Sequence, residues 1–148
     1  MGTFSVPVEV GNVDGSRYEP LEALVDTGAS YLVVPRSILS AVGVRVAERR
    51  QFTLADGREV EMDVGAVSLR LDGRSFPVLA VFGGDEAGTL LGAVALETFG
   101  LAADPIRGRL VPVSGLLMSG VGWLRGKAGP ARQTRLTGQR PGTYADDC

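Results

Sequence analysis

A carboxylate placed between two apolar segments constrains the fold of this chain more than any other feature. Residues 23–35, ALVDTGASYLVVP, bring Asp26 into a short turn and then return at once to apolar residues. Short apolar segments bounded by a turn are typical of buried strands. A charged side chain loses solvation there unless neighbouring groups donate hydrogen bonds to it. Residues 27–30 can supply such groups, as closely approaching backbone N–H groups and two hydroxyls.

The rest of residues 3–113 repeats this pattern of short apolar segments and glycine turns. The chain has 21 glycines in 148 residues, which favours turns over long helices. Asp-Gly pairs at 56–57 and 72–73 predict two hairpins, because both residues of such a pair can adopt positive φ. We expect a bulge or bend next to Gly65, where the apolar alternation changes phase. Other strands are expected at residues 6–10, 21–25, 31–34, 76–82, 89–91 and 109–113.

Two short helices interrupt the strands. Pro35 suits the first position of a helix, and Gly43 is placed to end it. The second helix is expected over residues 93–99, followed by Gly100. The sequence therefore predicts an all-β domain with two short helices.

Composition excludes several classes of chemistry. The chain has no histidine and a single cysteine, Cys148. Ser-His-Asp catalysis, Cys-His catalysis and zinc sites built on these residues are therefore excluded. The net charge of −2 does not indicate nucleic-acid binding. No apolar run approaches the roughly 20 residues that span a bilayer. We expect a cytoplasmic protein without cofactor, metal ion, nucleic-acid partner or membrane segment.

The charges divide the chain into two parts. Residues 115–148 carry five basic and two acidic side chains, a balance of +3, together with seven glycines. Residues 1–114 therefore carry the remaining −5. We predict one folded domain over residues 1–114 and a basic, glycine-rich, mostly disordered tail over residues 115–148.

Three segments together resemble the aspartic proteases. By itself, Asp26-Thr27-Gly28 is more typical of a structural turn than of an active site. The hairpin at residues 55–57 is similar to the flap of that family, and Leu90-Leu91-Gly92 with the helix after it resembles the segment crossing beneath its catalytic loop. Their order and spacing match the small, single-motif members, the retroviral-like proteases (retropepsins). The resemblance implies a closed, retropepsin-like β-barrel with a flap hairpin.

The resemblance also implies roles for individual residues. Asp26, Thr27 and Gly28 correspond to the catalytic motif, in which the threonine hydroxyl braces the loop of a second subunit. The substrate-binding positions are Ala29, Ser30, Ala55, Asp56 and Gly57.

In the aspartic proteases that this chain resembles, a pair of carboxylates holds one water and shares one proton. This chain has one such motif, because Pro105 follows Asp104 where a hydroxyl residue would be required. A homodimer is therefore expected, with Asp26 from each copy acting on a peptide or unfolded protein. Two alternatives remain: a non-catalytic peptide-binding, protein-binding or dimerisation module on the same fold, and a structural β-barrel in which Asp26 is a turn residue.

Overall fold

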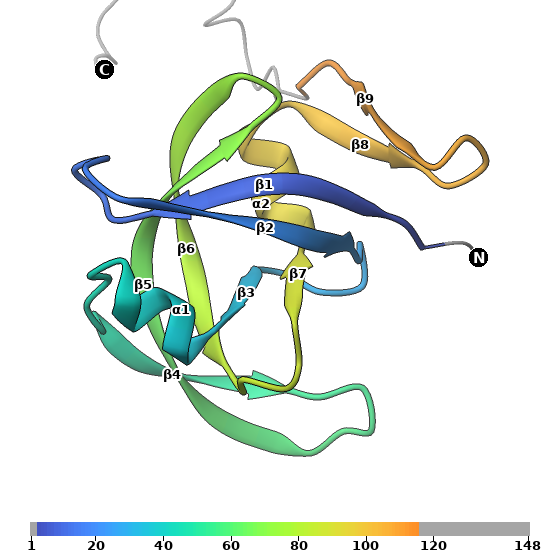
Figure 1. Cartoon of the computed structure of the whole chain (residues 1–148). Helices are drawn as coiled ribbons and strands as arrows, with labels where there is room; N and C mark the ends of the chain where they lie inside the picture. The colour runs from blue at the N-terminus through green and yellow to red at the C-terminus, as the bar shows by residue number, and fades with distance from the viewer. Residues whose placement is uncertain (1–2, 116–148) are drawn as a thin grey trace, which may run out of the picture. The chain divides into compact units, whose positions relative to one another are not determined.

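The computed structural model describes residues 3–115, which fold mainly into strands (Figure 1). The described residues up to Ser114 belong to one compact unit. The predicted tail, residues 115–148, lies outside the described residues except for Gly115. The elements in chain order are β1 (Ser5–Gly11), β2 (Tyr18–Val25), β3 (Leu32–Pro35), α1 (Arg36–Ala41), β4 (Glu48–Thr53), β5 (Glu59–Leu71), β6 (Arg74–Gly83), β7 (Thr89–Leu91), α2 (Ala93–Thr98), β8 (Leu101–Asp104) and β9 (Arg109–Pro112).

Six strands close into a barrel. The main sheet has the order β1-β2-β7-β3-β6-β5-β4, and β1 also pairs with β5. That additional pairing, Glu9 with Arg70 through Gly11 with Ser68, joins the two ends of the sheet. Strand β4 remains outside the closed ring and pairs with β5. Strands β8 and β9 form a separate two-stranded sheet. The predicted all-β barrel with two short helices is confirmed.

The core fills the inside of the barrel and the space beneath the helices. Leu39 of α1 and Leu96 of α2 are buried, so each short helix covers one opening between strands. Such helices are stabilised by packing of one apolar face, since six residues are too few for an isolated helix. The largest fully buried side chains are Leu32, Leu39, Leu69, Leu91, Val10, Val34, Val64 and Val67.

The two Asp-Gly hairpins use different turns. Between β5 and β6, Asp72 has φ 55° and Gly73 has φ 76°, which is the predicted two-residue turn with both positions left-handed. Between β4 and β5, only Gly57 has positive φ. There the N–H of Gly57 donates to the carbonyl of Leu54, and that of Leu54 donates to the carbonyl of Arg58. The loop therefore has three residues and a bulge at glycine, and the prediction of two positive-φ residues is wrong for this turn.

Of the bulge or bend expected near Gly65, the bulge is absent. Strand β5 pairs with β6 without interruption from Val64 opposite Val81 to Leu71 opposite Arg74. The burial does change phase, because Val64 and Val67 are both fully buried. Val67 belongs to the barrel core cluster and Val64 does not, so different neighbours bury the two faces of β5. The phase change in the sequence therefore reflects a change in which face of β5 is buried. It does not reflect an interruption of the hydrogen bonding between β5 and β6.

Three further elements differ from expectation. Pro35 is the last residue of β3, and the first helix begins at Arg36, although Gly43 ends it as predicted with φ 88°. The first half of β6 is exposed, because it pairs with β5 alone, and Phe76 packs edge-on against Phe99. Strand β8 was not predicted, since two of its four residues are alanines with weak strand preference.

Candidate active site

The Asp26 loop, residues 26–30, follows directly on β2. The backbone N–H of Asp26 donates to the carbonyl oxygen of Leu91 in β7 at 3.0 Å, which continues the parallel pairing of β2 with β7 by one residue. The N–H of Ala29 donates to the Asp26 carbonyl at 3.0 Å and closes a tight turn. The N–H of Gly28 donates to the Asp26 side-chain Oδ1, also at 3.0 Å. The carboxylate is therefore oriented by the turn that carries it.

The segment after β7 supports this loop from below. The N–H groups of Ala93 and Val94 donate to the carbonyls of Ala29 and Ser30, at 2.9 and 2.8 Å. A Cβ at Gly92 would lie 2.6 Å from the Tyr31 carbonyl oxygen and 2.7 Å from that of Ala29. A side chain at position 92 would therefore clash with the loop backbone. The predicted crossing of residues 90–92 beneath the Asp26 loop is present in the structure.

The outer side of the loop is open to solvent in the single chain. Thr27, Gly28 and Ser30 are exposed, and Asp26 and Ala29 are half-buried. The sequence predicted a poorly solvated carboxylate, but the apolar flanks bury the strands and not the Asp26 side chain. The reason is that the turn lies beyond the ends of β2 and β3, where the core stops.

The β4–β5 hairpin carries the other predicted site residues. Ala55, Asp56 and Gly57 form its tip and are exposed. The Asp56 carboxylate accepts hydrogen bonds from the N–H and the Nε of Arg58, which lower the pKa of Asp56. Within residues 3–115, no side-chain hydrogen bond or ion pair joins the tip to the Asp26 loop. The structure therefore brings residues 26–30 and 91–94 together and leaves the tip apart from them.

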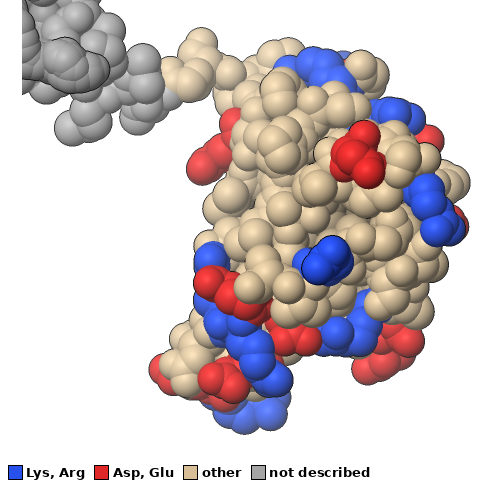
Figure 2. Space-filling view, turned by 90° about the vertical axis from the view of Figure 1, so that its left-hand side faces the viewer, with Lys and Arg blue, Asp and Glu red and all other residues tan. Residues whose placement is uncertain are grey.

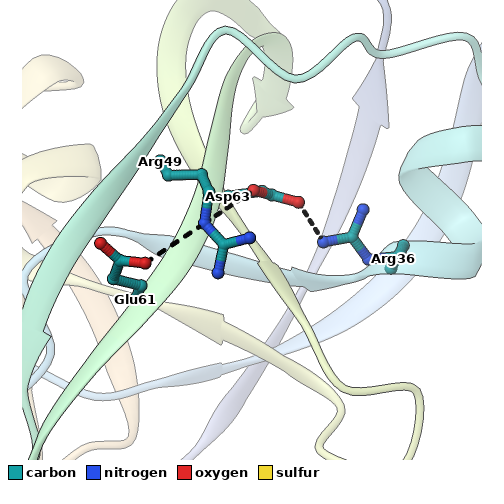
Figure 3. Close-up of polar contacts among 4 residues, drawn as sticks. All are labelled: Arg36, Arg49, Glu61 and Asp63. Atoms are coloured by element: carbon teal, nitrogen blue, oxygen red, sulfur yellow. Dashed lines mark hydrogen bonds and ion pairs between the residues drawn. The ribbon is translucent and has the colours of Figure 1, made fainter.

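Charged side chains surround the lower end of the molecule, where the hairpin lies. Figure 2 shows acidic and basic groups interleaved there, whereas the middle of this face is mostly uncharged. At the root of the hairpin, Asp63 of β5 lies between two arginines (Figure 3). It pairs with Arg36 of α1 at 2.5 Å and lies 3.9 Å from Arg49 of β4, which is 3.6 Å from Glu61. The Arg36–Asp63 pair joins the root of the hairpin to α1, whereas the contacts of Arg49 lie within the hairpin.

Sequence reasoning missed three residues that connect the hairpin to the Asp26 loop. Tyr31 directly follows the loop, and its ring lies edge-on to Phe52 of β4, with centroids 5.9 Å apart. Arg50 donates from Nη1 to the Tyr31 hydroxyl at 3.2 Å. In the sequence, the available signal was that Tyr31 is an aromatic residue directly after an acidic turn. Its contacts with Arg50 and Phe52 depend on where β4 lies in the fold.

Asp104 does not form a second catalytic site. Its carboxylate accepts hydrogen bonds from the N–H groups of Ile106 and Arg107 and pairs with the Arg107 guanidinium at 3.1 Å. These contacts, the backbone N–H of Arg107 first, lower the pKa of Asp104. The residue therefore holds the turn between β8 and β9, in agreement with the sequence argument from Pro105.

Among the described residues, no group of three or more His, Cys, Asp or Glu side chains is arranged to hold a metal ion. No described helix has the length and apolarity to cross a bilayer. A hollow of about 560 Å³ is lined by residues of β1, β2, the end of β5 and the β5–β6 turn, including Pro7, Leu21 and Arg70. The Asp26 loop does not line it, so this hollow is separate from the candidate site.

Comparison with known protein families identifies one that matches this chain. The family model "Aspartyl protease" matches residues 6–94, which include the Asp26 loop, the hairpin and residues 90–92. No curated protein sequence matches significantly.

Of three similar solved structures, the first shows the fold. The foamy viral protease–reverse transcriptase in complex with an RNA/DNA hybrid is 14% identical, with a TM-score of 0.51 over 77% of this chain and 13% of that one. The retroviral protease-like domain of Ddi1 from Leishmania major is 17% identical, with a TM-score of 0.49 over 76% and 89%. A retropepsin-like aspartic protease from Rickettsia conorii is 22% identical, with a TM-score of 0.45 over 70% and 88%. The chain therefore belongs to the aspartyl protease family and has the retropepsin-like fold.

Proposed function

We propose that this protein is an aspartic endopeptidase that acts as a homodimer on extended peptides or unfolded proteins. Its catalytic pair consists of Asp26 from each of two copies. The family supports the reaction class. The chain contributes one Asp-Thr-Gly sequence, and Asp104 is occupied in a turn, so the second carboxylate comes from another copy.

The observation that carries the proposal is the way in which the Asp26 loop is held. Hydrogen bonds from Asp26 to Leu91 and from Ala93 to Ala29 fix its backbone on two sides, and the Gly28 N–H orients the carboxylate. The exposed side of the loop, at Thr27 and Gly28, is the side that a second copy can approach. Asp14 and Asp56 are oriented in the same way by their own turns, so the backbone support from Leu91 and Ala93 is what distinguishes the Asp26 loop from them.

The chemistry follows from two carboxylates at hydrogen-bond distance. In aspartic proteases, two such groups about 3 Å apart share one proton, because they cannot both ionise easily. The ionised Asp26 takes a proton from a bound water as the water oxygen attacks the peptide carbonyl. Asp26 of the partner subunit, which is protonated, donates its proton to the carbonyl oxygen. The tetrahedral intermediate then collapses as a proton passes to the leaving amine, and the C–N bond breaks.

The surrounding residues serve binding and exclusion of water. Thr27 sends its hydroxyl to the partner loop, and Gly28 accepts a hydrogen bond from the substrate backbone at its carbonyl. Ala29 and Ser30 line the cleft beside the carboxylates. The hairpin tip at residues 55–57 closes over the peptide as a flap. Substrate binds as an extended strand through main-chain hydrogen bonds.

The deciding experiment compares Asp26→Asn with Asp14→Asn. Asp14 makes the same kind of turn, accepting at Oδ1 from the N–H of Ser16 at 2.9 Å, but lies in the exposed turn between β1 and β2. An unfolded protein is incubated with each variant between about pH 4 and pH 7. We expect Asp26→Asn to keep the fold and to lose cleavage, and Asp14→Asn to retain wild-type activity.

Two outcomes would contradict the proposal. Equal cleavage by Asp26→Asn and the wild type would exclude Asp26 as the catalytic group. No cleavage by the wild type at any pH, with no binding of a hydroxyl-containing transition-state analogue, would favour the non-catalytic binding module. Sedimentation separates a dimeric module from a monomeric structural barrel.

A further inference from the structure

Tyr31 directly follows the Asp26 loop, and neighbouring segments hold its backbone. The carbonyl of Ser30, the residue before it, accepts a hydrogen bond from Val94, and the Tyr31 carbonyl lies over Gly92. The residue after it, Leu32, is fully buried in β3. The backbone of Tyr31 is therefore fixed from both sides, and its half-buried side chain extends from a rigid base.

The side chain of Tyr31 contacts the inward face of β4. Arg50 and Phe52 are half-buried, whereas Arg49, Gln51 and Thr53 are exposed. Because side chains alternate along a strand, Arg50 and Phe52 share the face that meets Tyr31. The Phe52 ring stands at 87° to the Tyr31 ring, and the Arg50 guanidinium lies 5.9 Å from the Tyr31 ring centroid.

Arg50 is held in place from the other side. Its Nη2 and Nε lie 2.6 and 2.8 Å from Oε2 of Glu48, which leaves Nη1 directed at the Tyr31 hydroxyl. The guanidinium therefore joins Glu48 of the hairpin to Tyr31 of the barrel. Because the Arg50 guanidinium is already paired with Glu48 and bonded to Tyr31, we assign it a structural role and not the binding of substrate.

The hairpin has a second attachment on its outer side, the Arg36–Asp63 pair at the root (Figure 3). Beyond Phe52, the side-chain hydrogen bonds among the described residues join the hairpin only to itself, as between Asp56 and Arg58. The bond from Arg50 to Tyr31 is therefore, among these side-chain hydrogen bonds, the one nearest the tip that leaves the hairpin.

We propose that Tyr31 is a positioning residue, which couples the β4–β5 hairpin to the Asp26 loop through Arg50 and Phe52 and sets the height of the tip above the carboxylates. This role rests on the proposed function. The Asp26 loop and the hairpin are then joined through one side chain, so the position of the hairpin is set before substrate arrives. Such preorganisation lowers the cost of ordering the hairpin on binding.

The test uses Tyr31→Phe, Tyr31→Ala and Arg50→Met in the full chain, with Arg49→Met as the matched control. Arg49 is the adjacent residue of β4, its removal changes the charge equally, and it contacts Glu61 and Asp63 instead of Tyr31. Backbone 15N relaxation of residues 53–59 reports hairpin motion whether or not the protein cleaves peptides. Steady-state kinetics on a peptide substrate reports the functional consequence.

We expect Tyr31→Ala and Arg50→Met to lower the order parameters of residues 53–59 and to raise KM about fivefold, with a smaller change in kcat. Tyr31→Phe keeps the ring contact and should show a smaller effect. Combined with Arg50→Met it should add nothing further, because both changes remove the same hydrogen bond. Arg49→Met should leave both readouts unchanged.

Three results would overturn this role. Unchanged hairpin relaxation in Tyr31→Ala, with the rest of the spectrum preserved, would show that the hairpin does not depend on Tyr31. Equal effects of Arg49→Met and Arg50→Met would show that the loss of one positive charge, and not the contact with Tyr31, causes the change. A looser hairpin with unaltered KM would separate hairpin motion from substrate binding. Absence of all cleavage contradicts the proposed function instead, and relaxation then still decides the coupling.

Discussion

The backbone N–H of Asp26 donates a hydrogen bond of 3.0 Å to the carbonyl oxygen of Leu91. This bond joins the end of β2 to the end of β7, and it places Gly92 directly beneath the Asp26 loop. The loop is therefore supported by a strand from the other half of the sequence. The geometry of the loop therefore depends on Leu91 and Gly92, which contact its backbone.

Gly92→Ala should be strongly destabilising. The backbone of Gly92 is extended, with φ −93° and ψ 179°, so an alanine is not strained by its own dihedrals. Its Cβ would instead lie 2.6 to 2.8 Å from backbone atoms of residues 29–31. Overpacking of this kind costs about 3 kcal/mol of the free energy of unfolding. Urea denaturation measures the loss, and Gly115→Ala is the control, because nothing lies within 4 Å of its added Cβ. Equal stability of the two variants would contradict the tight contact.

Thr27→Val should weaken the dimer. Thr27 is exposed in the single chain, and valine keeps its shape while removing the hydroxyl proposed to reach the partner loop. Loss of that hydrogen bond from each subunit should raise the dimer dissociation constant about tenfold. Sedimentation equilibrium measures it. Asp26→Asn, which keeps a polar side chain of the same shape, should remain dimeric. An unaltered dissociation constant in Thr27→Val would remove the proposed role of the hydroxyl.

Asp104 should contribute to stability in a pH-dependent way. Its pKa is lowered from the usual value of 3.8, first by the backbone N–H of Arg107. The folded state thus favours the carboxylate, so the contribution is present above about pH 4 and is lost as the pH falls through the lowered pKa. Asp104→Asn keeps the acceptor oxygen but removes the titration. The free energy of unfolding should therefore decline less steeply below pH 4 in this variant. Parallel curves for the variant and the wild type would contradict the assignment.

Local patterns in the sequence were enough to predict many elements. The turn at Asp72-Gly73, the end of α1 at Gly43 and the crossing of residues 90–92 beneath the Asp26 loop are all confirmed. Each of these predictions rests on the conformational preferences of a few adjacent residues, or on a resemblance to a family in a few adjacent residues. The bulge near Gly65 was wrong for the opposite reason. Burial along β5 is set by which distant segment covers each face, and alternation in one strand does not contain that information.

The sequence by itself determined the kind of chain this is: short strands, glycine turns, one Asp-Thr-Gly loop and no histidine for other hydrolytic chemistry. Only the tertiary structure decided how the loop is held and what it touches. Closure of the barrel by β1 and β5 and the meeting of Tyr31 with Arg50 and Phe52 depend on strand order and register. These follow from packing between segments far apart in the chain, and single-sequence periodicity records only which side of each segment is buried.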